Sequence, residues 1–406
     1  MTLGVSQVRG WDLASMTVAA DGAATDAETF EEVALTVTNA FTGVQSDWNG
    51  EARDLAEVQV ADQASSLNDR ATRWRTASDR LRTAAEQLGL LKAEIERLVD
   101  DAASKTSMVG PIYIVADDGS VSVSPAFVAL YAASTPPAGP DVLGEAEAMA
   151  LQLQALLKRL LTNAAVAAEY YDWQITNALL GLADNERPFK PSYIPAPPPK
   201  PTGPRSFADR GGHGPNSYNV DDPGLMDSTY MAGLRFAALT GANRSEPLAP
   251  VASDMLRHYF GNSGAEYRMD VGALLQMPRF GAESDGTAVS EFVGAREALP
   301  PGYIGPVVFE GAYTDQSTFR PLPQEGLDAL GALGGFSYQT SGVAVPTDNG
   351  YSIDYKTSVY DYYDWDPTDQ TFSEQYSDLN DMHRAGWAQN FEVVGRSGLR
   401  ETEWRP

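Results

Sequence analysis

The chain contains no cysteine among its 406 residues, which excludes disulfide bonds and thiolate metal ligands. It also has no run of about 18 apolar residues, so we expect no membrane-spanning helix. The N-terminal region has one early cation, Arg9, and no continuous apolar stretch, which argues against an ordinary cleaved secretory signal. We therefore predict a soluble protein that, if exported, leaves by a route that needs no such signal.

Basic residues are few. The chain has 29 Lys and Arg against 55 Asp and Glu, for a net charge of −26. This charge opposes binding to phosphate backbones and anionic lipid surfaces, so we predict no nucleic-acid partner. Hydrophobic residues make up 43% of the chain and aromatic residues 10%, which is enough apolar material for two packed domains and too much for a disordered chain.

Two segments with few helix breakers flank the tripeptide Trp48-Asn49-Gly50. The first runs from about Glu28 to Ser46 and has apolar residues close to one helical face. The second, Glu51 to Ser104, would form a helix roughly 80 Å long at ~1.5 Å per residue. Its seam alternates spacings of four and three residues, as in a coiled coil. The seam residues are Leu67, Ala71, Trp74, Ser78, Leu81, Ala85, Leu88, Lys92, Ile95 and Val99.

A small β-hairpin and a third long helix are predicted next. The segments 111–115 and 120–123 flank an Asp-Gly turn at 117–119, which is typical of a hairpin. From Leu143 to Leu182, small and apolar residues keep the three-and-four spacing, which places a third helix against the first two. We predict an elongated all-α bundle over residues 1–186, with the hairpin as an insert.

Residues 187–205 carry eight prolines and no acidic residue. Polyproline II geometry would make a semi-rigid spacer, so we assign 187–206 as a linker. The alternative is a docking strip for a partner with an aromatic groove, because the run 195–199 (PAPPP) is preorganised in an extended form.

Residues 207–406 are predicted to form an α+β domain with a mainly antiparallel sheet. The clearest hairpin joins 335–345 to 351–360 through the turn 347–350 (TDNG). A strand at 391–395, a short helix near 380–389 and helical patches at 231–239 and 252–259 complete the prediction. The chain has neither a glycine-rich phosphate loop nor a serine nucleophile elbow.

The first 185 residues resemble the helical proteins handled by type VII (ESX) secretion systems of mycobacteria and their relatives. The resemblance rests on a helical hairpin with Trp-X-Gly at its turn, here Trp48 and Gly50, and on the opening segment 8–12 (VRGWD). It implies that Trp48 packs into a partner helix or a secretion chaperone and that Gly50 permits the turn. The two-part layout is similar to that of conserved mycobacterial proteins encoded among type VII secretion genes.

The family's second export mark is Tyr followed four residues later by an acidic residue, just after the helical hairpin. Tyr113 and Asp117 satisfy this count, but they lie in the predicted β-hairpin rather than at a helix end. The same count recurs at Tyr218, Tyr360 and Tyr362. Export by this route therefore stays an expectation, with the protein in the cytoplasm first and then secreted or in the cell envelope.

Candidate chemistry in the C-terminal half is concentrated in one short region. Its members are Asp361, Tyr363, Asp364, His383 and Arg384. They resemble the Asp-X-Tyr-Asp and His-Arg set of colicin M-type lipid II phosphatases, which implies a phosphatase acting on envelope lipid. The gap between the second Asp and the His is much longer here than in that family.

Two other interpretations of this region are a calcium site and a solvated sheet edge. Asp364, Asp366 and Asp369 could bind calcium, but the glycine and glutamate of a helix-loop-helix calcium site are missing. The acidic strand end could instead be a solvated sheet edge. A zinc site would consume all three histidines, which have no close-spaced pair, so we predict no metal and no cofactor.

Three function classes follow. The favoured one is a type VII secretion-associated two-domain protein whose helical domain binds secretion machinery, a chaperone or a partner helical protein, and whose C-terminal domain is a binding or cargo module. The second is a secreted enzyme or toxin that acts through the C-terminal domain. The third is a structural assembly protein of the envelope, and the sequence leaves the oligomeric state open.

Overall fold

The computed structural model describes residues 3–45, 50–132, 138–184, 186, 188–200, 232–233, 235–237, 239–240, 243, 250–313, 336–363, 379 and 381–406. The chain forms two compact units. The first unit contains residues 1–193 together with 296–308, and the second contains 194–295 and 309–406. Within the described residues no helix is both long enough and apolar enough to cross a membrane.

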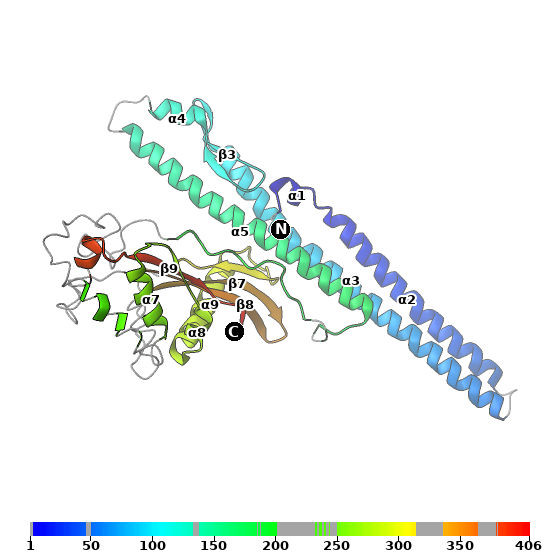
Figure 1. Cartoon of the computed structure of the whole chain (residues 1–406). Coiled ribbons are helices and arrows are strands. Elements are labelled where there is room, and N and C mark those ends of the chain that lie inside the picture. The colour runs from blue at the N-terminus through cyan, green and yellow to red at the C-terminus, as the bar shows by residue number, and fades with distance from the viewer. Residues whose placement is uncertain are drawn as a thin grey trace. The chain divides into compact units, whose positions relative to one another are not determined.

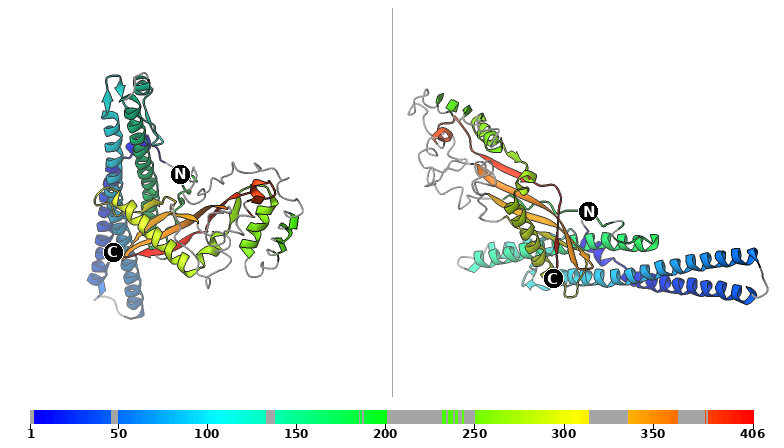
Figure 2. Two further views of the ribbon diagram at one scale, coloured as in Figure 1. Left: turned by 90° about the vertical axis from the view of Figure 1, so that its left-hand side faces the viewer. Right: turned by 90° about the horizontal axis from the view of Figure 1, so that it is seen from below.

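Among the described residues, five helices form the first unit (Figure 1). They are α1 (Val5–Arg9), α2 (Leu13–Val44), α3 (Glu51–Ser104), α4 (Pro125–Ala132) and α5 (Ala138–Leu180). The predicted bounds of α3 are confirmed. The helix α2 begins at Leu13 rather than near Glu28, because Asp12 caps its N-terminus by accepting a hydrogen bond from the Ser15 N–H at 3.0 Å. Figure 2 shows α2 and α3 side by side from two further directions.

Buried residues of α3 lie on two neighbouring stripes. The stripe at 71, 78, 88 and 95 belongs to the predicted seam, and a second stripe follows at 77, 84, 91 and 98. The two polar members of the seam are both paired. Ser78 donates to the carbonyl of Ala20 at 2.8 Å, and Lys92 donates to the carbonyls of Arg9 and Trp11 at 2.8 and 3.0 Å.

Two short hairpins connect α3 to α4. The predicted one pairs β3 (Tyr113–Val115) with β4 (Val121–Val123) and is confirmed. The other, β1 (Thr106–Ser107) with β2 (Gly110–Pro111), was not predicted. Neither was α4.

Two further segments pack against the helices of the first unit. Phe189 lies against the rings of Tyr170 and Trp173, at 5.3 and 5.6 Å between centroids. The segment 296–308 is fastened by two side-chain carboxamides: Gln87 accepts from the N–H of Ile304 at 2.8 Å, and Asn163 accepts from that of Val308 at 2.7 Å. This segment lies far from the helices in sequence, yet it belongs to their unit.

The second unit is built on a six-stranded sheet in the order β5-β9-β8-β7-β6, with β10 also paired to β8. The strands of the sheet are β5 (Tyr267–Met269), β6 (Val307–Glu310), β7 (Ser337–Thr347), β8 (Gly350–Tyr363), β9 (Phe391–Arg396) and β10 (Arg400–Trp404). The first two residues of β6, Val307 and Val308, are assigned to the first unit. The helices of the second unit include α7 (Pro250–Gly261), α8 (Val271–Leu275) and α9 (Pro278–Glu297). The β7–β8, β8–β9 and β8–β10 pairs are antiparallel, whereas β5–β9 is parallel.

The α+β prediction is therefore correct at the level of a mixed sheet with helices. The β7–β8 hairpin is confirmed, with Thr347 opposite Gly350 across the turn. The helix predicted over 380–389 is shorter, because the residues described as helical there are 379 and 381–384. Helix α9 was missed because Gly281, Gly286 and Gly294 interrupt its pattern. Gly281 is required there, since an added Cβ would lie 2.7 Å from the carbonyl oxygen of Leu275.

One face of the sheet carries the main hydrophobic core of this unit. Because side chains alternate along a strand, Tyr338 of β7, Val359 of β8 and Phe391 of β9 share that face. They form one cluster with Tyr259 of α7 and Phe280 of α9. The opposite face carries a row of buried polar residues instead.

Candidate functional site

The part of the α2–α3 hairpin nearest its turn is covered by fewer neighbours than the rest. We call residues 28–44 and 51–70 the distal hairpin. Helix α5 ends at Leu180, and Asp184 just after it pairs with Arg80 at 2.9 Å. No residue of α3 before Ala71 is buried, and on the distal part of α2 only Ala34 is buried. The distal hairpin is thus a two-helix stretch.

Large apolar side chains are exposed on the distal hairpin. Leu35, Leu55 and Val58 expose 61%, 63% and 59% of their surface. The half-buried positions of α3 in this stretch form one line along the helix, the side that packs on α2. They include 53, 56, 60, 64 and 67. At 100° per residue, Leu55 and Val58 point away from that line and lie on one common face, three residues apart. These two apolar side chains have no partner among the described residues, and Glu51 and Asp62 lie on the same face on either side of them.

Acidic residues surround that face. Between residues 28 and 70 the sequence has nine Asp and Glu against two Arg. One of the acidic residues, Glu31, is paired with Arg75 at 2.8 Å. A partner with an apolar helix face flanked by basic residues would complement this surface.

The turn motif can be assessed only at its glycine. Trp48 and Asn49 lie outside the described residues. Gly50 has φ +84° and ψ −165°, a conformation open to glycine and strained for other residues, and its position is the N-cap of α3. The role of Trp48 and Gly50 as a turn motif stays a prediction.

Tyr113 and Asp117 have a different setting from the one an export mark on a helix would need. Tyr113 begins β3, and Asp117 lies in the turn after it. The carbonyl of Asp117 accepts from Val5 N at 2.7 Å, and its carboxylate accepts from Ser6 N at 2.6 Å. Hydrogen bonds from Ser6 lower the pKa of the Asp117 carboxyl. In the structure, Asp117 holds the first turn of α1.

The phosphatase-like set is only partly described, because Asp364 lies outside the described residues. Asp361 lies on β8 opposite Val393, and Tyr363 opposite Phe391. The ring of Tyr363 stacks on that of Phe391 at 4.8 Å, within the core cluster. Tyr363 is therefore a packing residue.

His383 and Arg384 come from the short helical turn before β9. His383 is 1% exposed, and its Nδ1 accepts a hydrogen bond from the N–H of Asn390 at 3.2 Å. Since Asn390 precedes Phe391, the turn carrying His383 reaches the strand end where Tyr363 lies. Arg384 is half-buried. The structure places Tyr363 and His383 near the same end of the sheet, in its packed interior.

The other histidines give no metal site in the described structure. His213 lies outside the described residues. His258, in the last turn of α7, has its Nε2 2.8 Å from the carbonyl oxygen of Ala265, and its ring lies edge-on to Phe391. Within the described ranges no three His, Asp or Glu residues are grouped to hold a metal ion. Asp366 and Asp369, the other candidate calcium ligands, are not described.

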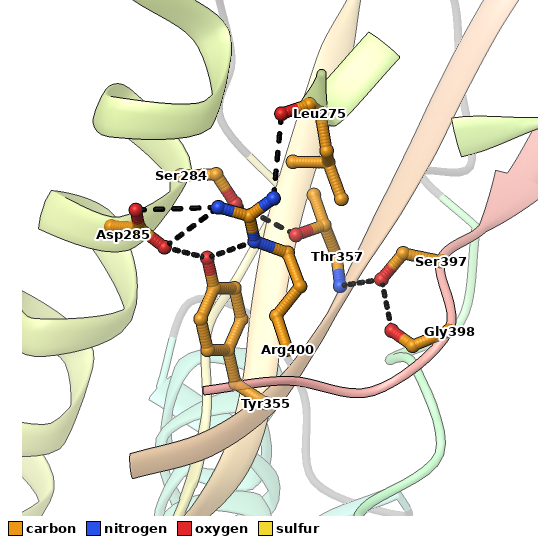
Figure 3. Close-up of polar contacts among 8 residues, drawn as sticks. All are labelled: Leu275, Ser284, Asp285, Tyr355, Thr357, Ser397, Gly398 and Arg400. Carbon is orange, nitrogen blue, oxygen red and sulfur yellow. Dashed lines mark hydrogen bonds and ion pairs between the residues drawn. The ribbon is translucent and has the colours of Figure 1, made fainter. Parts of the chain in front are cut away.

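Sequence reasoning missed a polar network between α9 and the sheet (Figure 3). Tyr355 donates to the Asp285 carboxylate and accepts from Arg400 Nε at 3.1 Å. A second nitrogen of Arg400 lies 3.3 Å from both Asp285 oxygens. Burial, reinforced by the hydrogen bond to Asp285, raises the pKa of Tyr355 to about 12. Beside it, the hydroxyls of Ser284 and Thr357 lie 2.7 Å apart.

A β-bulge places Arg400 in this network. Arg396 pairs with Ser358, whereas Arg400 pairs with Tyr355, so three residues of the β9–β10 strand face two of β8. Ser397 in the bulge accepts from Thr357 N at 2.9 Å and donates to Gly398 O at 2.7 Å (Figure 3). The polar groups of the network hydrogen-bond to one another, which is typical of residues that stabilise the packing of a helix on a sheet.

Two shallow hollows lie on the first unit. One, of about 440 Å³, is lined only by α3 residues between Asp62 and Arg73. The other lies between α2 and α3 near Leu13 and Glu86. Neither gathers groups suited to catalysis, because the first presents one helix flank and the second a helix seam.

Comparisons with known proteins identified no relative of this chain. No family model, no curated protein and no solved structure matches the chain.

Proposed function

We propose that the protein is a two-domain, type VII secretion-associated protein whose helical unit binds a partner helical protein through the distal hairpin. The observation that carries the proposal is the exposure of Leu55 and Val58 on the outward face of a two-helix stretch. Burying each side chain in a partner would contribute about 1.5–3 kcal/mol. A partner helix pair would complete a four-helix bundle over this stretch.

The expected partner has a defined chemistry. Its docking face is apolar, to cover Leu55 and Val58, and basic at the rim, to meet the acidic surface of the distal hairpin. Secretion machinery and a dedicated chaperone are the partner classes implied by the Trp-X-Gly resemblance. The second unit is then the binding or cargo module that accompanies the helical unit.

The resemblance to type VII substrates implies export through a type VII secretion system. It is supported by the glycine conformation at the hairpin turn and by the length of the two helices on either side of it. The protein would be made in the cytoplasm and delivered to the cell envelope or the medium. An enzymatic role finds less support, because Tyr363 and His383 are packed inside the unit.

Export from a mycobacterial host tests the route. The full chain is expressed in a strain with a working type VII system and in an otherwise identical strain without one. We expect the protein in the culture filtrate of the first strain only, with similar cytosolic amounts in both. Equal amounts in the two filtrates would reject the proposal.

A further inference from the structure

Part of the proline-rich segment is bound to the sheet of the second unit. We call residues 194–200 (IPAPPPK) the strap. The carbonyl oxygen of Pro195 accepts hydrogen bonds from Ser341 Oγ at 3.2 Å and from the Arg396 guanidinium. At the other end, the Lys200 ammonium pairs with Glu392 at 2.9 Å and with Glu266. The strap is thus held at both ends, which a free spacer would not be.

The anchors show that the strap crosses the sheet. Ser341 lies on β7, Arg396 and Glu392 on β9, and Glu266 just before β5. Since β8 separates β7 from β9, the strap must pass over β8. The two ends are also offset along the strands, because Ser341 is opposite Lys356 of β8 whereas Glu392 is opposite Tyr362. The strap therefore crosses the sheet obliquely, in the extended form that polyproline II geometry gives it.

A row of polar side chains lies on the same face of the sheet. Gln339 pairs with Ser358, and Ser358 with Arg396, so the three project from one face in a line across three strands. Gln339 is 0% exposed and Ser358 1%. Within the described structure, neither carboxamide atom of Gln339 and no atom of the Ser358 hydroxyl has a hydrogen-bond partner. Buried groups in this state are rare in native proteins and point to a missing ligand.

The strap itself is poorly suited to satisfy these groups. Between 195 and 199 only Ala196 has a backbone N–H, because proline has none. An ordinary extended peptide has both an N–H and a C=O at every residue. A glutamine carboxamide can pair with one of each at once, since it has both donors and an acceptor.

We propose that this face of the sheet is a binding groove for an extended peptide, and that the strap is its built-in, exchangeable occupant. The ligand is a peptide segment with ordinary residues where the strap has Pro197 to Pro199, so that Gln339 and Ser358 are satisfied. It carries a Lys or Arg five residues after the residue whose carbonyl meets Arg396. That cation takes the place of Lys200 between Glu266 and Glu392.

The strap can be replaced by a peptide in solution because one of its two anchors is exposed to solvent. Lys200 and its two carboxylate partners are partly exposed, so these ion pairs can open to solvent without unfolding the unit. The strap competes mainly through its tether, which keeps it at high effective concentration. Weakening the Lys200 anchor should therefore open the groove to a peptide in solution.

Fluorescence anisotropy with two labelled peptides tests the groove. One has the strap sequence IPAPPPK, and the other has alanine in place of its last three prolines. With the full-length Lys200→Ala protein, we expect the alanine peptide to bind at least 10-fold more tightly than to the wild type, and at least 5-fold more tightly than the strap peptide. In the double variant with Gln339→Leu, that 5-fold preference should disappear. No binding to Lys200→Ala, or a preference that survives Gln339→Leu, would overturn the proposal.

A charge reversal gives a second readout that is independent of Gln339. In the Lys200→Ala background, Glu392→Lys should weaken binding of the alanine peptide at least 5-fold, and a peptide ending in Glu should recover it. Glu401→Lys is the matched control, because Glu401 lies on the same face of the sheet, on β10. Equal effects of the two substitutions would reject the groove. Circular dichroism shows whether each variant is folded. If the Gln339→Leu variant does not fold, the charge-reversal experiment alone tests the groove.

Discussion

The side-chain oxygen of Asn163, fully buried in α5, accepts a hydrogen bond from the backbone N–H of Val308 at 2.7 Å. On α3, Gln87 does the same for Ile304. The helical unit thus recognises the main chain of a segment that lies more than a hundred residues further along the sequence. The chain leaves this unit after Tyr193, returns to it at Arg296 and leaves again after Val308.

Replacing Asn163 should destabilise the helical unit. In Asn163→Leu the N–H of Val308 loses its acceptor while still buried, which costs about 1–3 kcal/mol in the free energy of unfolding. Urea unfolding followed by far-UV circular dichroism measures the change. Thr162→Ala, the neighbouring position, is the control and should stay within about 0.5 kcal/mol of the wild type. Equal effects of the two substitutions would contradict the anchoring role of Asn163.

A chain that ends at Tyr193 should be stabilised by a peptide of residues 296–308 added in solution. The shortened chain keeps Gln87 and Asn163 but lacks the segment that pairs with them. Because a ligand that binds only the folded state raises stability by mass action, the melting temperature should rise with peptide concentration. A peptide of the same composition in scrambled order should have no effect. An unchanged melting temperature with the native peptide would show that the helices do not recognise it.

Gly50→Ala should weaken the helical hairpin through backbone strain alone. No atom lies within 4 Å of an added Cβ at Gly50, but φ +84° with ψ −165° costs a non-glycine residue about 1–3 kcal/mol. Gly43→Ala is the matched control. Gly43 is helical with open space around it, so alanine there should stabilise by about 0.5–1 kcal/mol. Thermal unfolding of both variants should therefore shift in opposite directions, and a loss of stability in both would refute the strain argument.

Alkaline pH should destabilise the second unit through Tyr355. Its pKa is raised from 10.0 to about 12 in the folded protein, so the folded state holds this proton more tightly than the unfolded state. The resulting stability is complete below pH 10 and is lost as the pH rises toward 12. Tyr355→Phe should be less stable at neutral pH, because the bonds to Asp285 and Arg400 are lost, but its stability should fall less steeply between pH 10 and 12. Urea unfolding across this range tests the slope, and parallel curves for variant and wild type would contradict it.

The sequence predicted the elements whose patterns are long and regular. The bounds of α3 were predicted correctly because Gly50 marks its start and the three-and-four spacing continues from Leu67 to Val99. The β7–β8 hairpin was predicted correctly because its turn residues are specific. Helix α9 was missed because its three glycines hide the pattern. The packing of segment 296–308 against α3 and α5 depends on two amides, and no local pattern marks an amide as an acceptor for a distant main chain.

The candidate sites were less predictable. Exposure of Leu55 and Val58 follows from the place where α5 ends, which a seam analysis of α3 alone does not give. The Asp285, Tyr355 and Arg400 network depends on a bulge that shifts the register by one residue, and a bulge is invisible in a strand pattern. Pro195 and Lys200 are anchored by partners that lie 66 to 201 residues further along the sequence, namely Ser341, Arg396, Glu266 and Glu392, and no local pattern shows that these come together.

Export of an interface variant tests the central claim most directly. Leu55→Glu with Val58→Glu places two charges on the face proposed to bind the partner, while Val18→Glu changes another exposed apolar residue, 70% exposed, outside the distal hairpin. The three proteins are compared in culture filtrate and cytosol of a mycobacterial host with a working type VII system. The account predicts that the double variant folds and accumulates in the cytosol but is lost from the filtrate, whereas Val18→Glu is exported like the wild type. Export of the double variant at the wild-type level would contradict the account.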